Sequence, residues 1–163
     1  MRNQFWVANG AIPTTDSQVA VALAANTILT LIELTVPQTF EIIPVAWGIS
    51  FNASAAAAPG VVELFETTAA IGSGGTTVVP HKYSNPTGPA AVTTAKFTAA
   101  TEGTVAGLRM ADVQLIAPTN QYIYQWPLGR EFTTGGAGAT RYLRVRAKFA
   151  AIVSCIAWVQ WEE

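Results

Sequence analysis

The side chains that could perform catalysis are few in this sequence. His81 is the single histidine and Cys155 the single cysteine, so neither a His/Cys metal cluster nor an internal disulfide can form. A Ser-His-Asp arrangement would depend on His81 alone, which reads as an ordinary loop residue beside Lys82 and Tyr83. Cys155 falls in an apolar run, which indicates a buried and unreactive thiol. The sequence therefore predicts no enzyme, no cofactor and no metal site.

The carboxylates and the glycine-rich tracts do not form recognisable sites either. Glu63 and Glu66 are three residues apart in a predicted strand, so their side chains point to opposite faces and cannot act together as acid and base. Gly72–Gly75 and Gly135–Gly138 lack the strand, the helix and the Lys-Ser/Thr of a phosphate-binding loop. Both tracts are typical of flexible turns.

Basic side chains form one stripe along the sequence. Arg144, Arg146 and Lys148 alternate with apolar residues, and Tyr142 lies in line with them, as in sheets that bind single-stranded nucleic acid. The net charge of −1, however, gives no general attraction to nucleic acid or to an anionic membrane, so we expect neither partner. The stripe is instead expected to form cross-strand ion pairs with glutamates: Glu33, Glu63 or Glu66.

Apolar side chains recur at every second residue through most of the chain, which predicts β-strands. The pattern is clearest in these segments: 27–36, 43–51, 61–67, 121–126, 141–149 and 151–161. Pro44 and Gly48 interrupt the second segment, which indicates an edge strand or a bulge, and Ala53–Ala58 is expected to form a turn or a single helical turn. Without a convincing helix, the sequence predicts an all-β fold, an antiparallel β-sandwich of the jelly-roll kind.

Two segments do not follow the strand pattern. Residues 1–17, which include Phe5 and Trp6, are predicted to form an extended N-terminal arm ahead of a single sandwich domain at residues 18–163. Residues 68–96 are predicted to form a long loop, in which only residues 78–83 resemble a strand. Long loops in compact domains often bind partners, so both segments are candidate contact elements.

The tryptophans and the low charge bear on assembly. Trp47 and Trp158 lie in apolar rows and are expected in the core, whereas an exposed set of tryptophans would instead suit a carbohydrate-binding module. Charged residues make up only 12% of the chain, against about 25% in an average soluble protein, which excludes a disordered chain and a solvated helical bundle. Such an exterior is tolerable when other protein covers much of it.

We therefore expect a homotrimer, because residues 151–161 are apolar on both faces of their predicted strand. The candidate residues of the subunit interface lie on the last two predicted strands: Tyr142, Arg144, Arg146, Val153, Val159 and Trp161. The first residues contain no continuous apolar stretch, so no signal peptide is predicted and synthesis in a reducing cytosol is expected.

Several segments carry a resemblance to a known group of proteins: Glu33–Pro37 (ELTVP), Trp47–Phe51 (WGISF), Pro59–Glu66 (PGVVELFE), Gln125–Arg130 (QWPLGR) and Tyr142–Glu163. In these segments the chain resembles small β-rich virion proteins of tailed bacteriophages, from about residue 18 onward. The resemblance implies a capsid decoration (cement) protein, made in the host cytoplasm and located on the capsid exterior, or else a minor tail or fibre-associated protein. Its partners would be other copies of itself and the major capsid protein, and the candidate capsid contacts are Phe5, Trp6, His81 and Tyr83.

Overall fold

The computed structural model describes residues 3–10, 13, 15–52, 58–136 and 138–163, and in these ranges it contains strands but no helix. The strands are β1 (Gln4–Ala8), β2 (Val21–Leu23), β3 (Leu29–Val36), β4 (Glu41–Asn52), β5 (Gly60–Thr67), β6 (Ser73–Val78), β7 (His81–Lys82), β8 (Thr94–Thr101), β9 (Arg109–Ile116), β10 (Gln121–Gln125), β11 (Thr134–Gly135), β12 (Arg141–Lys148) and β13 (Val153–Glu162). The predicted all-β fold is confirmed. The predicted turn at Ala53–Ala58 lies mostly outside the described residues.

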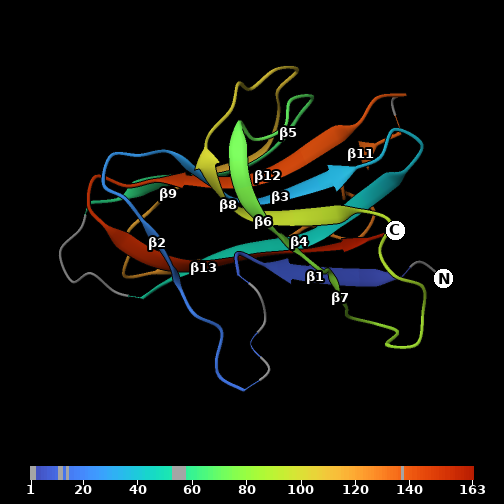
Figure 1. Ribbon diagram of the computed structural model, residues 1–163, viewed down its shortest axis with the longest axis horizontal. Coiled ribbons are helices and arrows are strands. Elements are labelled where there is room, and N and C mark those ends of the chain that lie inside the picture. The colour runs from blue at the N-terminus through green and yellow to red at the C-terminus, as the bar shows by residue number, and fades with distance from the viewer. Residues whose placement is uncertain (1–2, 11–12, 14, 53–57, 137) are drawn as a thin grey trace.

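The strands form two antiparallel sheets that face each other as a sandwich (Figure 1). Sheet A has the strand order β10-β4-β13-β1-β7, with β2 beside β13 and β11 beside β4. Sheet B has the order β6-β8-β3-β12-β5-β9. Four connections carry the chain from sheet B to sheet A, namely β3 to β4, β6 to β7, β9 to β10 and β12 to β13. The jelly-roll topology stays a prediction.

The core lies between the two sheets and draws on nearly every long strand. Strands β12 and β13, the central strands of the two sheets, contribute alternate residues such as Val145 and Val159. From the facing strands, Trp47 of β4 and Leu34 of β3 are fully buried. The alternation of apolar side chains in the sequence thus follows the inward faces of the sheets.

Strand β4 contains the bulge that its proline indicated. On β13, Gln160 pairs with Ala46 while the next residue, Trp161, pairs with Pro44, so Val45 is an extra residue. Proline has no N–H to donate to a ladder, and a bulge removes the need for one. The extra residue also shifts the alternation, so that Ile42 and Trp47 both face the core.

The prediction for β13 requires a correction. Its core row is Val153, Cys155, Ala157, Val159 and Trp161, all buried. Val153, Val159 and Trp161 therefore pack inside their own subunit and are not available as a subunit interface. Trp158, which was expected in the core, lies on the opposite, half-buried face.

The predicted N-terminal arm is wrong for residues 4–8. These residues form β1, which lies between β13 and β7 in sheet A, and the buried Phe5 ring stacks on Trp161 with ring centroids 5.9 Å apart. Asn9 continues the pairing after β1 ends. Its side-chain Nδ2 donates to the carbonyl of Cys155 (3.1 Å) and its Oδ1 accepts from the N–H of Ala157 (3.1 Å). Residues 4–9 are thus part of the domain.

The segment 68–96 is also more regular than the sequence indicated. It contains β6, β7 and the start of β8, and β6 pairs with β8 at the border of sheet B. Gly and Thr have little hydrophobic alternation to offer, so β6 (SGGTTV) gives no period-two signal. The part after β7 does form a loop.

Candidate functional site

A hydrogen-bonded carboxylate connects the two sheets near one side of the sandwich. Asp112 of β9 accepts hydrogen bonds from Tyr122 Oη (2.6 Å), Trp47 Nε1 (3.2 Å) and Gln114 Nε2 (3.0 Å). Burial, followed by the hydrogen bond to Asp112 and its charge, raises the pKa of the Tyr122 hydroxyl. Both Asp112 oxygens are occupied by donors from the same chain, so the group ties β4, β9 and β10 together.

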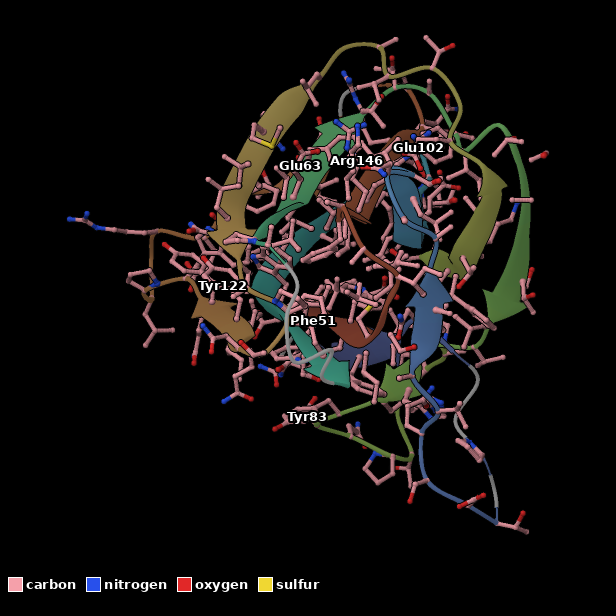
Figure 2. All side chains as sticks on the ribbon, turned by 90° about the vertical axis from the view of Figure 1, so that its left-hand side faces the viewer. Phe51, Glu63, Tyr83, Glu102, Tyr122 and Arg146 are labelled. Carbon is pink, nitrogen blue, oxygen red and sulfur yellow. The ribbon has the colours of Figure 1, made fainter. Side chains whose placement is uncertain are left out.

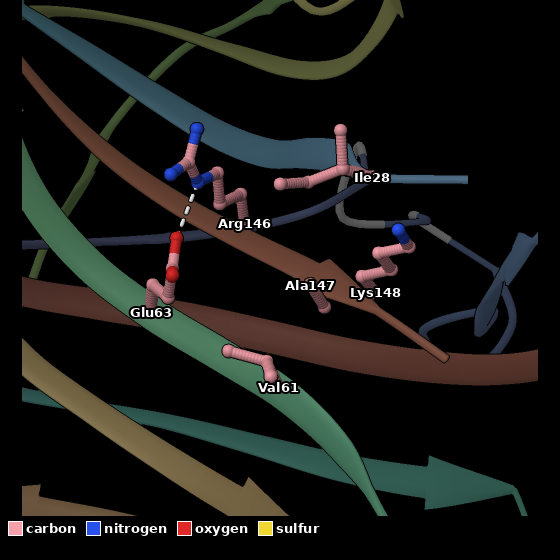
Figure 3. Close-up of a pocket in the computed structure, with 6 residues that line it drawn as sticks. All are labelled: Ile28, Val61, Glu63, Arg146, Ala147 and Lys148. Carbon is pink, nitrogen blue, oxygen red and sulfur yellow. Dashed lines mark hydrogen bonds and ion pairs between the residues drawn. The ribbon is translucent and has the colours of Figure 1, made fainter. Parts of the chain in front are cut away.

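The basic stripe forms the ion pairs that the sequence predicted. Arg144 Nε lies 3.1 Å from Glu33 Oε2 across the β12–β3 pairing, and Arg146 pairs with Glu63 across the β12–β5 pairing (Figure 3). The third predicted partner, Glu66, instead pairs with Arg109 at 2.7 Å.

The candidate interface residue Arg144 is not at the surface. Its side chain is 0% exposed, and its guanidinium also donates to the carbonyl of Ala69 and lies 3.6 Å from Glu102. Glu102 in turn accepts from the N–H and the hydroxyl of Thr30, both at 2.6 Å. Because the segments around Ala69 and Glu102 cover the guanidinium, the prediction that Arg144 contacts another subunit is wrong. Tyr142 and Arg146 are only partly buried, and their role at an interface stays a prediction.

The outer side of sheet B carries a small pocket beside this network. It has a volume of about 160 Å³ and is lined by Ile28, Val61, Glu63, Arg146, Ala147 and Lys148 (Figure 3). Figure 2 shows Glu63, Arg146 and Glu102 gathered on that side of the sandwich. Since Glu63 and Arg146 are already paired with each other, Lys148 is the remaining charge of the lining, and it is exposed.

Cys155 is an inert thiol, as the sequence indicated. The residue is fully buried, and burial raises the pKa of the thiol from 9.0 to about 12. The Nδ2 of Asn9 lies 3.8 Å from Sγ and acts in the opposite direction. A thiol held neutral and out of contact with water is a poor nucleophile.

Three of the four candidate capsid contacts lie together on the outer face of sheet A. Trp6 and His81 are cross-strand partners with ring centroids 6.5 Å apart, and Tyr83 follows β7 with its N–H bonded to the carbonyl of Gln4. Tyr83 points away from the sandwich (Figure 2) and is exposed. The prediction that Phe5 contacts a capsid is wrong. Phe5 immediately precedes Trp6 on β1, so its side chain points to the opposite face, into the core.

Trp158 extends this outer face toward β4. A side chain at Gly48 would meet three indole atoms of Trp158 at nearly equal distances, 2.8 to 2.9 Å. The indole of Trp158 therefore packs closely over Gly48, its cross-strand partner on β4. We call the set Trp6, His81, Tyr83 and Trp158 the aromatic face.

A second surface was missed by the sequence reasoning. Strand β9 is the edge strand of sheet B and β10 is the edge strand of sheet A, and both lie on the same side of the sandwich. Several of their apolar side chains are exposed: Met110, Val113, Leu115, Ile123 and Tyr124. One signal was available, because Asp112 is the only charged residue between Arg109 and Arg130. The inward row of β9 is polar at Asp112 and Gln114, so the strand lacks the apolar core row that marks the other long strands.

The described part of the chain contains no cluster of three or more metal-ligating side chains, and it contains no helix that could cross a membrane. Comparisons with protein families, with curated proteins and with solved structures found no match for this chain.

Proposed function

We propose that this chain is a structural protein of a virus particle, specifically a decoration protein that binds the outside of the head and stabilises it. The observation that carries the proposal is the aromatic face, where Trp6, His81, Tyr83 and Trp158 gather on one side of a rigid sheet. Tryptophan and tyrosine supply much of the binding energy at protein interfaces. The resemblance to phage virion proteins supplies the partner, the major capsid protein.

The rest of the molecule supports a structural role. The two sheets share a single large core, and the ionisable groups that lie close together are engaged in ion pairs or hydrogen bonds within the chain. A decoration protein needs a rigid scaffold and a contact surface rather than an active site. Copies that are joined to one another would bind the particle more firmly than a single copy, because each later contact then forms within the same assembly.

The first test is the number of copies of this chain in purified virions, measured by mass spectrometry against labelled peptide standards. A decoration protein should be present at the same order of abundance as the major capsid protein. A few copies per particle would instead indicate the minor tail or fibre-associated role, and complete absence would contradict both.

The second test locates the contact. Recombinant chain is added to particles made without its gene, and binding is measured by co-sedimentation. Trp6→Gln and Trp158→Gln should weaken binding, whereas Ile152→Gln, at an exposed position between β12 and β13, should bind like the unaltered chain. Equal binding by all variants would remove the aromatic face from the proposal.

A carbohydrate-binding module is the second candidate, and the position of Trp158 favours it. The partly exposed indole of Trp158 packs over Gly48, and Trp6 lies on β1, the strand that pairs with the other edge of β13, so the two indoles could together contact a sugar ring. Trp47 and Trp161, however, are fully buried and cannot contribute. A glycan array with the unaltered chain and with Trp158→Gln decides the matter, since a module of this kind must show binding that the substitution abolishes.

A further inference from the structure

The two sheets of this sandwich end very differently on their two sides (Figure 2). On one side, β6 ends sheet B and β7 ends sheet A. The pairing of β6 with β8 is interrupted by an extra residue, Ala100 of β8, and β6 has two glycines with positive φ, Gly74 (72°) and Gly75 (80°), while β7 is only two residues long. Bulges, twisted backbone and short strands are the devices that prevent a border strand from pairing with another molecule.

The other side, formed by β9 and β10, lacks most of these devices. Strand β9 pairs with β5 alone among the described strands, so the groups on its free edge have no strand beside them. Its one bulge falls at Ala111, which leaves Asp112–Ile116 as regular extended backbone. On the outward side of that stretch, Val113 is 50% exposed and Leu115 is 74% exposed.

We propose that the free edge of β9 is a self-association surface, on which β9 of a second copy adds as an antiparallel strand about a twofold axis. Sheet B would then continue across two subunits. Strand addition to an open edge satisfies the backbone N–H and C=O groups and buries the alternate side chains of both strands. A twofold contact is also the only closed arrangement in which one edge is its own partner.

The charges on β9 exclude one register, and a centre at Val113 is the register that sets Asp112 opposite a hydrogen-bond donor within β9. In an antiparallel pair about a twofold axis, one residue must lie opposite its own copy. A centre at Asp112 would place two carboxylates opposite each other, which is destabilising. A centre at Val113 instead sets Asp112 opposite Gln114 of the second copy, an amide that already donates to Asp112 within the subunit (3.0 Å). It also sets Val113 against Val113 on the outward side.

This contact differs from the trimer that the sequence predicted, whose expected contacts Val153, Val159 and Trp161 are in the core. It is also independent of the proposed function, because β9 lies on a side border of the sandwich whereas the aromatic face lies on β1, β7 and β13. The chain can therefore form this dimer whether or not it binds a virus particle.

The test measures the oligomeric state of the full chain by sedimentation equilibrium at micromolar concentrations. The unaltered chain should be a dimer. Val113→Lys places two ammonium groups opposite each other and should raise the dissociation constant by about tenfold or more. The matched control is Thr76→Lys, an exposed position on the protected strand β6, which should leave the dimer unchanged. Circular dichroism checks that both variants are folded.

A single-cysteine experiment tests the register. Because Cys155 is buried and is the only native cysteine, Val113→Cys introduces the only accessible thiol. It should form a disulfide-linked dimer under mild oxidation, whereas Thr76→Cys should not. A monomer at all concentrations, a trimer, or a dimer that Val113→Lys leaves intact would overturn the proposal. A dimer that Val113→Lys dissociates but Val113→Cys does not cross-link would overturn the register.

Discussion

Arg144 shows how a charged side chain is accommodated inside this fold. Its guanidinium is fully buried, yet Glu33 lies at 3.1 Å, Glu102 at 3.6 Å, and the carbonyl of Ala69 accepts one of its N–H groups. Removing a charge from water is costly, and only close partners with matching geometry offset that cost. The arginine therefore fixes the position of the segments that contain Ala69 and Glu102 over sheet B.

Replacing one partner of this buried pair should be far worse than replacing both. Arg144→Met leaves Glu33 buried without its cation, so we expect the free energy of unfolding to fall by about 3–5 kcal/mol. The double variant Arg144→Met with Glu33→Met should lose clearly less than the sum of the two single variants. Urea denaturation of the four proteins gives the coupling, and simple additivity would show that the pair does not act as a unit.

Cys155 makes a prediction about alkaline pH. The pKa of its thiol is about 9.0 in the unfolded chain and about 12 in the folded one, so folding favours the neutral form. The resulting stability is complete below about pH 9 and is lost as the pH rises toward about 12. This group alone should lower stability by up to about 1.4 kcal/mol per pH unit in that window.

The comparison that isolates the thiol is Cys155→Ala. Its free energy of unfolding should fall less steeply between about pH 9 and about 12 than that of the unaltered chain, even if its absolute stability is lower. Parallel slopes would show that the thiol is not shielded. Ionisation of Tyr122 also lowers the stability at high pH, because burial raises the pKa of its hydroxyl, but this contribution is the same in both proteins.

At the scale of the strand, β1 and β13 show what alternation alone can and cannot decide. The period of two correctly predicted strands β3, β4, β5, β10, β12 and β13, an irregularity at Pro44, and ion pairs between the basic stripe and glutamates of neighbouring strands. It could not decide which face of β13 is inward, because both rows are apolar, and a shift of one residue exchanges them. It also missed β1, whose partner β13 lies at the other end of the chain and leaves no local signal.

The candidate site shows the same limit. Trp6 belongs to the first predicted contact segment, and His81 and Tyr83 belong to the second. Only the pairing of β1 with β7 brings the three residues together. Phe5 belonged to the same choice and failed, because neighbouring residues of a strand point to opposite faces. The exposed edge of β9 depends on the order of strands in sheet B, which the sequence does not state.

Strand β1 gives a direct test of these faces. Phe5→Ala removes a buried ring that stacks on Trp161, and we expect a loss of about 3–5 kcal/mol in the free energy of unfolding. Trp6→Ala, one residue later on the half-buried outer face, should lose less than half as much. Thermal or urea unfolding of the two variants measures the difference, and an equal loss would contradict the assigned orientation of β1.

The whole molecule has very little free charge. Charged residues make up 12% of the chain, and many of them are engaged internally, as in the pairs of Arg109, Arg144 and Arg146 with glutamates. Charge repulsion between molecules is therefore weak, so it does little to oppose association through exposed apolar residues such as Leu115 and Leu128. Both proposed contact surfaces therefore lie on a molecule with weak electrostatic protection against association.

The chain should consequently be least soluble close to its isoelectric point of about 5.8. Light scattering across a pH series should show the largest particles near that value and smaller ones at pH 8. Val113→Glu should reduce the association at pH 8, because it adds a negative charge at the open edge and increases the net charge from −1 to −2. Scattering that does not depend on pH would show that apolar contact alone controls association.

The termini of the domain lie side by side, since Gln4 pairs with Glu162 and the N–H of Asn3 bonds to the carbonyl of Glu163 (Figure 1). On the ribosome, β1 is made long before β13, so the first strand has to wait for the last before sheet A can close. Folding should then be slow, because contacts between distant parts of a chain form late. The same neighbourhood allows the two ends to be joined by a short linker and the chain to be reopened elsewhere, for example at the turn between β9 and β10.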